Sequence, residues 1–230
     1  MINKLERYEM AENKAVANGN IFEAEMVGTA NGRSYKEKAY AALYPEKCKT
    51  DNLDNEELFE KMLQIREDAQ TEFRDTMNFN KKRISLDKAM ELVEKCQTSD
   101  PENPTRLFAN KLYQAVKNRF VSDKYILKFF SAAGGTHLDV SHGIDCYFKL
   151  YDKNTGKELT RATIDITQHP KNDWTKSDVL LYVAKEDSDK LDNSRGNKNF
   201  DAKFLQEIVE KEAEKITDAM IENFQKRINI

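Results

Sequence analysis

The sequence is poor in cysteine, proline, glycine and tryptophan. It contains three cysteines, four prolines, eight glycines and one tryptophan among 230 residues. Cys48, Cys96 and Cys146 are odd in number and widely spaced, and no pair forms a Cys-x-x-Cys zinc or redox motif. No apolar run approaches the roughly 20 residues needed to cross a bilayer, and the first residues lack the apolar segment of a signal peptide. We therefore expect a reduced, cytoplasmic protein, or part of a virion assembled in a host cytoplasm, with no membrane partner.

The chain also lacks an excess of positive charge. Its 37 Lys and Arg residues are outnumbered by 40 Asp and Glu, which gives a formal net charge of -3. A protein that holds nucleic acid by charge alone is normally basic, so any contact with DNA must be local or assisted by a metal ion. Charged residues nevertheless make up 33% of the chain and the mean hydropathy is -0.78, which indicates a strongly solvated, helix-rich protein. Abundant Lys, Asn, Ile, Asp and Glu beside sparse Gly and Pro are typical of AT-rich bacterial or phage genomes.

Several catalytic motifs are missing as well. The sequence contains no Gly-rich phosphate-binding loop, no Gly-x-Ser-x-Gly nucleophile elbow and no convincing Ser-His-Asp or Cys-His set. A small-molecule enzyme has the least support of the functions considered, because no cofactor fingerprint is present.

Hydrophobic periodicity predicts an α+β fold with a helical N-terminal half. A mixed α/β core with an antiparallel hairpin follows, and a long helix closes the chain. The Pro-containing stretch 98–104 suggests a boundary between a helical region, residues 1–100, and the core, residues 101–230. Asn103 and Pro104 have the pattern of an N-cap and a first helical residue. The polar stretch 185–199 is expected to be a mobile loop.

The best-specified helix of the N-terminal half begins at Asp54. Asp54 is a favourable N-cap, and Glu57 stands three residues later, as in a capping box. An apolar stripe at helical spacing is expected to face the core. Its members are Leu58, Met62, Ile65, Ala69, Phe73 and Met77.

The most informative segment consists of two alternating apolar–polar runs joined by the turn at residues 152–157. The apolar faces hold Ile144, Cys146, Phe148 and Leu150 on the first strand and Ala162, Ile164 and Ile166 on the second. Asp145 and Asp165 then lie on the opposite, polar faces. The short turn sets Asp145 opposite a residue near 164–166. Asp is disfavoured in strands, so these two carboxylates either hold a metal ion or form the wet side of a sheet.

Potential metal ligands are dense around this hairpin. They are His137, His142, His169, Asp139, Asp145 and Asp165. Oxygen ligands from two or three carboxylates suit Mg²⁺ or Mn²⁺, whereas a His-rich set would suit zinc or a heavier transition metal. The spacing matches no zinc signature. Histidine and aspartate also favour turns and strand ends, so chance clustering is the alternative.

A helix followed by a hairpin with Asp145 on its first strand and Asp165-Ile166-Thr167 on its second resembles the core of the PD-(D/E)XK nuclease superfamily. In that family the first-strand Asp and the second-strand acid hold one or two divalent metal ions, and a Lys two residues after the second acid positions the nucleophile. The resemblance implies that Asp145 and Asp165 bind Mg²⁺ or Mn²⁺. The backbone carbonyl of Ile166 would be a further ligand.

Thr167 departs from the family pattern, because it stands where the lysine is expected. Its hydroxyl can hydrogen-bond a water molecule but supplies no positive charge. Lys171 or Lys176, just beyond the strand, could reach back in its place. The catalytic set implied by the resemblance is Asp145, Asp165, Thr167 and Lys171, with His137 or His142 assisting proton transfer. The likeness spans residues 104–184, less than half of the chain.

Two functions from different classes follow from these observations. The first is a metal-dependent nuclease that hydrolyses DNA phosphodiesters. The second is a non-catalytic structural or assembly subunit with a nuclease-like core, such as a phage virion neck or tail ring component, whose partners are other protein subunits or copies of itself. The oligomeric state distinguishes them, since a ring of many copies favours the second.

Overall fold

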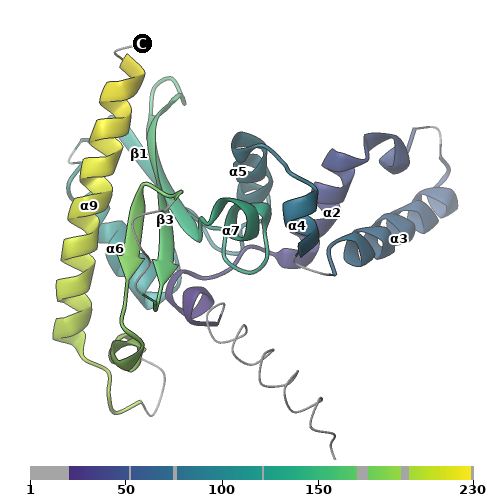
Figure 1. Ribbon diagram of the computed structural model, residues 1–230. Helices are drawn as coiled ribbons and strands as arrows, with labels where there is room; N and C mark the ends of the chain where they lie inside the picture. Colours follow the sequence, from purple (N-terminus) through teal and green to yellow (C-terminus); the bar gives the residue numbers. More distant parts are fainter. Residues whose placement is uncertain are drawn as a thin grey trace, which may run out of the picture.

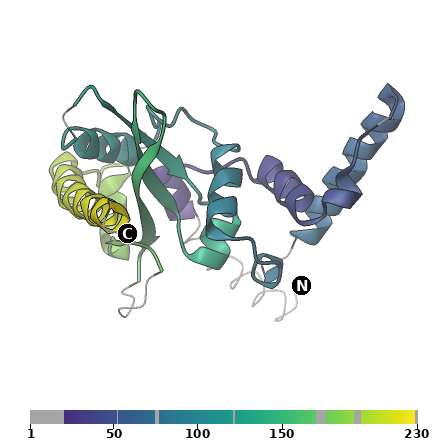
Figure 2. The same ribbon diagram turned by 90° about the horizontal axis from the view of Figure 1, so that it is seen from above.

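The computed structural model describes residues 21–51, 53–74, 77–120, 122–169, 176–192 and 197–228. The fold is α+β, as predicted, with helices packed on both faces of a mixed sheet (Figures 1 and 2). The helical elements are residues 21–27, α2 (Gly32–Leu43), η1 (Pro45–Cys48), α3 (Asn55–Glu72), α4 (Met77–Lys81), α5 (Leu86–Glu94), α6 (Leu107–Lys117), α7 (His137–His142), η2 (Lys185–Asp187), α8 (Ser188–Leu191) and α9 (Ala202–Ile228). The strands are β1 (Tyr125–Ser131), β2 (Cys146–Asp152), β3 (Glu158–Thr167) and β4 (Val179–Tyr182).

The predicted hairpin forms the centre of the sheet. Strand order is β1-β2-β3-β4, in which β1, β2 and β3 are antiparallel neighbours and β4 runs parallel to β3. Cys146 pairs with Ile164 and Phe148 with Ala162, which confirms the expected register. The residues just before Cys146 therefore lie opposite residues 165 and 166, where the turn length had placed them.

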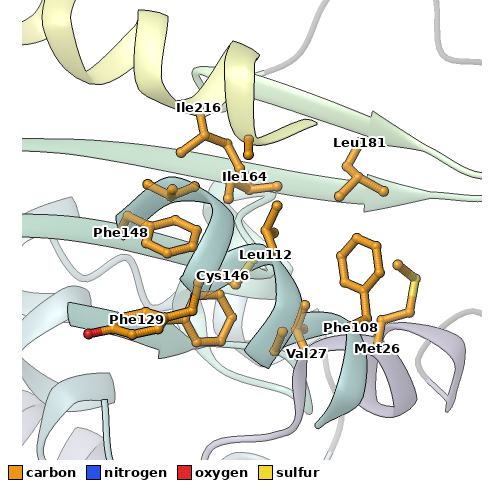
Figure 3. Packing of buried hydrophobic residues seen from close by; sticks show 14 of the residues in the cluster. Met26, Val27, Phe108, Leu112, Phe129, Cys146, Phe148, Ile164, Leu181 and Ile216 are labelled. Atoms are coloured by element: carbon orange, nitrogen blue, oxygen red, sulfur yellow. The ribbon is translucent and has the colours of Figure 1, made fainter. Parts of the chain in front are cut away.

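One face of the sheet carries the expected apolar side chains. Cys146, Phe148 and Ile164 are fully buried there against Leu112 of α6 and Ile216 of α9 (Figure 3). Burying a side chain the size of Phe or Ile contributes about 1.5–3 kcal/mol, so each of these residues stabilises the sheet by a substantial amount. Ile144 is an exception to the prediction: it precedes β2 and packs on the opposite side.

Of the two alternatives for the opposite face, a metal site or the wet side of a sheet, the second is wrong, because this face is covered. Phe130 and Tyr147 stack there with ring centroids 5.1 Å apart, and the Tyr147 hydroxyl donates to the carbonyl of Met90 in α5. The N-terminal helices cover this side, so Asp145 and Asp165 are only 4% and 7% exposed. An alternating pattern identifies two faces of a strand but does not say what packs on the second one.

A buried ion-pair network accounts for a charged residue on the covered face. Lys149 of β2 lies 2.7 Å from a Glu94 carboxylate oxygen and 2.8 Å from one of Glu158. Buried charges are stable only when they are paired in this way. The network joins α5 to the two central strands.

The capping box at the start of α3 is present as predicted. Asp54 accepts hydrogen bonds from the backbone N–H groups of Glu56 and Glu57, and the Glu57 side chain accepts from the Asp54 N–H. Part of the expected stripe is buried, but Met62 is exposed because α3 and α2 form an arm that projects from the sheet (Figures 1 and 2). One hydrophobic cluster contains residues from both sides of position 100, and the division at that point stays a prediction.

Two further expectations need correction. Helix α6 begins at Leu107 with Arg106 as its N-cap, not at Pro104, because residues 101–103 form a turn in which the Asn103 N–H donates to Asp100. Part of the stretch expected to be a mobile loop is ordered as η2 and α8, since Leu191 is buried in the core. No helix in the described ranges is both long and apolar enough to span a membrane.

Candidate metal centre

Three carboxylates from separate segments converge beside the start of β2. Glu23 comes from the helix at residues 21–27, Asp139 from α7, and Asp145 from the residue just before β2. One ligand oxygen of each lies within 4.8 Å of the other two, and the part of the chain that the structure describes contains no second group of three His, Cys, Asp or Glu residues that meets this condition. We call these three residues the acidic cluster. An all-oxygen set of this kind suits a hard cation such as Mg²⁺ or Mn²⁺.

Asp145 is held by both neighbouring strands. Its carbonyl accepts from the N–H groups of Ala132 and Ala133 after β1, at 2.7 and 3.0 Å, and its own N–H donates to Ile164 of β3. One carboxylate oxygen, Oδ2, accepts from the Ile166 N–H at 2.7 Å. The Asp145 carboxylate thus accepts a hydrogen bond from β3 that a backbone carbonyl would accept in a regular strand pair. The sheet therefore fixes the position of this side chain.

Asp139 is oriented by the loop that precedes α7. Thr136 caps this short helix by accepting from the Asp139 N–H, and Asp139 Oδ2 accepts from the N–H groups of Gly134 and Gly135 at 3.2 and 3.0 Å. Both glycines have positive φ, 102° and 81°, a conformation that other residues adopt only with strain. The paired glycines therefore let two consecutive amides face one carboxylate oxygen.

Glu23 is brought to the other two acids by the packing of its helix. Phe22, Met26 and Val27 of the same helix are buried in the main core, as seen for Met26 and Val27 in Figure 3. The chain then turns at Gly28, whose carbonyl accepts a 2.6 Å hydrogen bond from the Ser131 hydroxyl at the end of β1. These contacts fix the helix beside the end of β1, where the N–H groups of Ala132 and Ala133 donate to Asp145.

The electrostatics of the acidic cluster are unfavourable in the absence of a cation. Burial raises the pKa of Asp145 to about 8, and the charge of Glu23 adds to this, while the hydrogen bond from the Ile166 amide acts in the opposite direction. Burial also raises the pKa of Asp139, against the effect of the two glycine amides. Asp165 raises the pKa of both residues. A bound divalent cation would remove this penalty, because it favours the ionised form of each carboxylate.

Two of the residues named by the sequence pattern lie close to the acidic cluster. Asp165 is near enough to act on the pKa of Asp139 and Asp145, although it is outside the group of three converging oxygens. The Ile166 N–H points to Asp145, and in an extended strand the carbonyl of the same residue points to the same side. The Ile166 carbonyl therefore faces the side of β3 on which Asp145 lies.

The other predicted residues have different surroundings. The Thr167 hydroxyl forms a local turn with His169, accepting from its N–H and donating to its carbonyl, each at 3.1 Å. Lys171 lies outside the described residues. Lys176 donates to the carbonyl of Ser141 in α7 at 3.0 Å.

The histidines of α7 are structural. His137 is fully buried; its Nδ1 lies 2.9 Å from the Tyr35 hydroxyl and its Nε2 lies 3.0 Å from the Lys82 carbonyl. Burial lowers the pKa of His137 to about 4, so the ring is neutral and both nitrogens are in use. His142 makes a similar contact to the carbonyl of Ile84. These histidines tie α7 to the N-terminal helices and leave no free nitrogen on His137 for proton transfer.

Sequence reasoning missed Glu23. The segment at residues 21–27 is short and ambiguous between helix and strand, and nothing in its spacing relates it to the hairpin. The one available signal was an acidic residue within a short apolar segment, which is too common to indicate a ligand.

Comparisons of the chain with protein-family models, with curated proteins and with solved structures found no match. The chemistry of the acidic cluster therefore has to be inferred from its own residues.

Proposed function

We propose that the protein binds a divalent cation, Mg²⁺ or Mn²⁺, at the acidic cluster and uses it to hydrolyse DNA phosphodiesters. The observation that carries this proposal is the convergence of Glu23, Asp139 and Asp145 oxygens within 4.8 Å of one another. Such oxygens are the ligands that Mg²⁺ and Mn²⁺ prefer. When bound, the cation would supply the positive charge that stabilises a phosphoryl group during displacement.

The residues of the chain have separate tasks in this proposal. Asp139 and Asp145 hold cation-binding oxygens in place, because backbone amides from the glycine loop and from β3 fix both carboxylates. Glu23 completes the set from the N-terminal helix. Asp165 adds negative charge nearby, and the Ile166 carbonyl is a candidate further ligand. The hairpin resembles the PD-(D/E)XK core, which supports the choice of a phosphodiester substrate.

Calorimetric titration with Mn²⁺ tests the metal site directly. The wild-type protein should bind Mn²⁺, and Asp145→Asn should lose most of that binding because a central carboxylate becomes neutral. Asp152→Asn is the matched control, since it makes the same chemical change at the far end of β2. Unchanged Mn²⁺ affinity in Asp145→Asn would exclude the acidic cluster as the site.

DNA hydrolysis needs a separate assay. We expect nicking of supercoiled DNA in the presence of Mg²⁺ or Mn²⁺ and no nicking in EDTA or with the Asp145→Asn variant. Metal binding without cleavage under these conditions would retain the cation site and reject the nuclease activity.

A second function, a structural or assembly subunit such as a virion neck or tail ring component, is favoured by the projecting arm. Phe59, Met62 and Leu63 of α3 are 63%, 56% and 40% exposed on it. Exposed apolar side chains at helical spacing are typical of a surface that contacts another chain.

Light scattering coupled to size-exclusion chromatography tests this alternative. An assembly subunit should form an oligomer that Phe59→Asp disrupts. Asn55→Asp, one turn earlier on α3, adds the same charge and should leave the oligomer intact. A wild-type monomer at high concentration would exclude self-assembly through this arm.

A further inference from the structure

A hollow lined by basic side chains lies where the projecting arm meets the loop before α7. Its volume is about 410 Å³, and it is formed by α2, the C-terminal end of α3 and the loop before α7. The six residues that line it are Gly32, Arg33, Lys36, Gln70, Arg74 and Gly134. We call this feature the basic hollow. It contains three positive charges and no carboxylate among its described lining residues.

The basic hollow adjoins the acidic cluster. Gly134 lines the hollow with its backbone, and the N–H of the same residue donates to Asp139 Oδ2 at 3.2 Å. Gly32, the first residue of α2, sits against this loop, since a Cβ atom placed on Gly32 would lie 3.6 Å from the Gly134 carbonyl oxygen. A ligand in the hollow would thus lie against the same glycine loop that holds Asp139.

The charges of the hollow are available to a ligand. Within the described ranges, no ion pair joins Arg33, Lys36 or Arg74 to an acidic side chain, whereas the nearby Arg66 is paired with Glu37 at 2.9 Å. Arg33 and Arg74 are exposed and Lys36 is half-buried. The hollow also lies at the N-terminal end of α2, where the helix dipole adds partial positive charge. In a chain with a net charge of -3, this is a local concentration of unpaired positive charge.

We propose that the basic hollow binds the phosphate backbone of double-stranded DNA and holds it beside the acidic cluster; the choice of DNA rests on the proposed function. Guanidinium groups match phosphate oxygens with two parallel N–H donors, and the two arginines supply them from separate segments, Arg33 from α2 and Arg74 from the bend just after α3. None of the six described lining residues is aromatic. Proteins that hold single strands stack bases on aromatic side chains, so a hollow with charge and no stacking surface fits the backbone of a duplex.

Fluorescence anisotropy with a labelled DNA duplex, measured in EDTA over a range of salt concentrations, tests the proposal. EDTA removes the cation and stops cleavage, so the assay reports binding alone. The triple variant Arg33→Gln/Lys36→Gln/Arg74→Gln should bind at least about tenfold more weakly than wild type at low salt. Its plot of log affinity against log salt should be less steep by roughly 0.9 for each phosphate that the variant no longer neutralises, or about 2.7 for three phosphates.

The matched control is Lys124→Gln/Lys153→Gln/Lys157→Gln. These three lysines are exposed at the opposite end of the β2–β3 hairpin, and the control lowers the net charge by the same amount. Binding close to that of wild type is expected for this variant. An equal loss of affinity in both triple variants would overturn the proposal, as would wild-type binding to polyglutamate as tight as binding to the duplex.

Mn²⁺ titration of the hollow variant separates this proposal from the cation site. The variant should bind Mn²⁺ as wild type does, because none of its substituted residues belongs to the acidic cluster. Loss of DNA binding with normal Mn²⁺ binding supports the basic hollow. A wild-type protein that binds Mn²⁺ but no duplex overturns the proposal for the basic hollow and retains the cation site. Selective duplex binding without Mn²⁺ binding supports the basic hollow and rejects the cation site.

Discussion

Replacing Asp145 by Asn should stabilise the protein at alkaline pH when no metal ion is present. The Asp145 side chain is 4% exposed, and burial, together with the charge of Glu23, raises its pKa from 3.8 to about 8. Asn keeps an oxygen that can accept from the Ile166 N–H, so the substitution removes the charge and retains the hydrogen bond.

The sign and size of the effect follow from the two pKa values. Between pH 3.8 and about 8 the folded protein keeps a proton that the unfolded chain has released, so the wild-type protein loses stability as the pH rises through this window. Each pKa unit corresponds to about 1.4 kcal/mol, which sets an upper limit of about 6 kcal/mol. The raised pKa depends in part on the neighbouring carboxylates, so the effect of one substitution is smaller than this limit. We expect Asp145→Asn to raise the free energy of unfolding by about 2–5 kcal/mol at about pH 8 and by little at about pH 4.

Urea unfolding in EDTA at both pH values measures this difference. Asp152→Asn is the control, and its effect on stability should have the opposite sign. The hydrogen bond from the Thr155 N–H lowers the pKa of Asp152, so the folded protein favours the ionised form of Asp152. Saturating Mn²⁺ should then stabilise the wild-type protein and leave Asp145→Asn unchanged. If Asp145→Asn is less stable than wild type at about pH 8 in EDTA, the ionised carboxylate is not destabilising and the case for an electrostatic need for a cation fails.

Three further measurements test the structure around the site. Asp54→Ala should cost about 1 kcal/mol in urea unfolding because it removes the α3 capping box, and an unchanged midpoint would contradict the cap. The pKa of His137 is lowered from 6.5 to about 4, so the wild-type protein should lose stability as the pH falls through this range, and a His137 NMR titration with a midpoint near 6.5 would refute its burial. Gly135→Ala should cost about 1 kcal/mol because φ is 81° there, and it should weaken Mn²⁺ binding by moving an amide away from Asp139; normal Mn²⁺ binding would show that the loop does not position the acid.

The sequence was informative where the signal was local. The hairpin has a period of two and a turn between its strands, and the capping box of α3 lies within four residues, so short-range physics fixes both. The surroundings of Asp145 were not local. Tyr147 follows it by two residues and is buried against α5, and only the placement of the N-terminal helices decides that this face is covered.

Only part of the acidic cluster was predicted, because one of its three residues comes from a segment that is distant in sequence. Asp139 and Asp145 are close in sequence, and both were recognised as potential ligands. Glu23 reaches them only because its helix packs into the core and the chain then crosses the end of β1. The start of α6 was misplaced because two local signals compete: Asn103 and Pro104 favour a helix start, whereas Asp100 and Pro101 favour the turn that forms and displaces the helix to Leu107.

The acidic cluster and the basic hollow have opposite charges and share one glycine loop, and this arrangement couples the binding of the cation to the binding of DNA. Without a cation, the ionised carboxylates of the acidic cluster would repel a phosphate group that the hollow brings near, which offsets the attraction of Arg33 and Arg74. A divalent cation adds two positive charges at the acidic cluster and so weakens this repulsion. Cation binding should therefore strengthen DNA binding, and by thermodynamic reciprocity DNA should strengthen cation binding by the same factor.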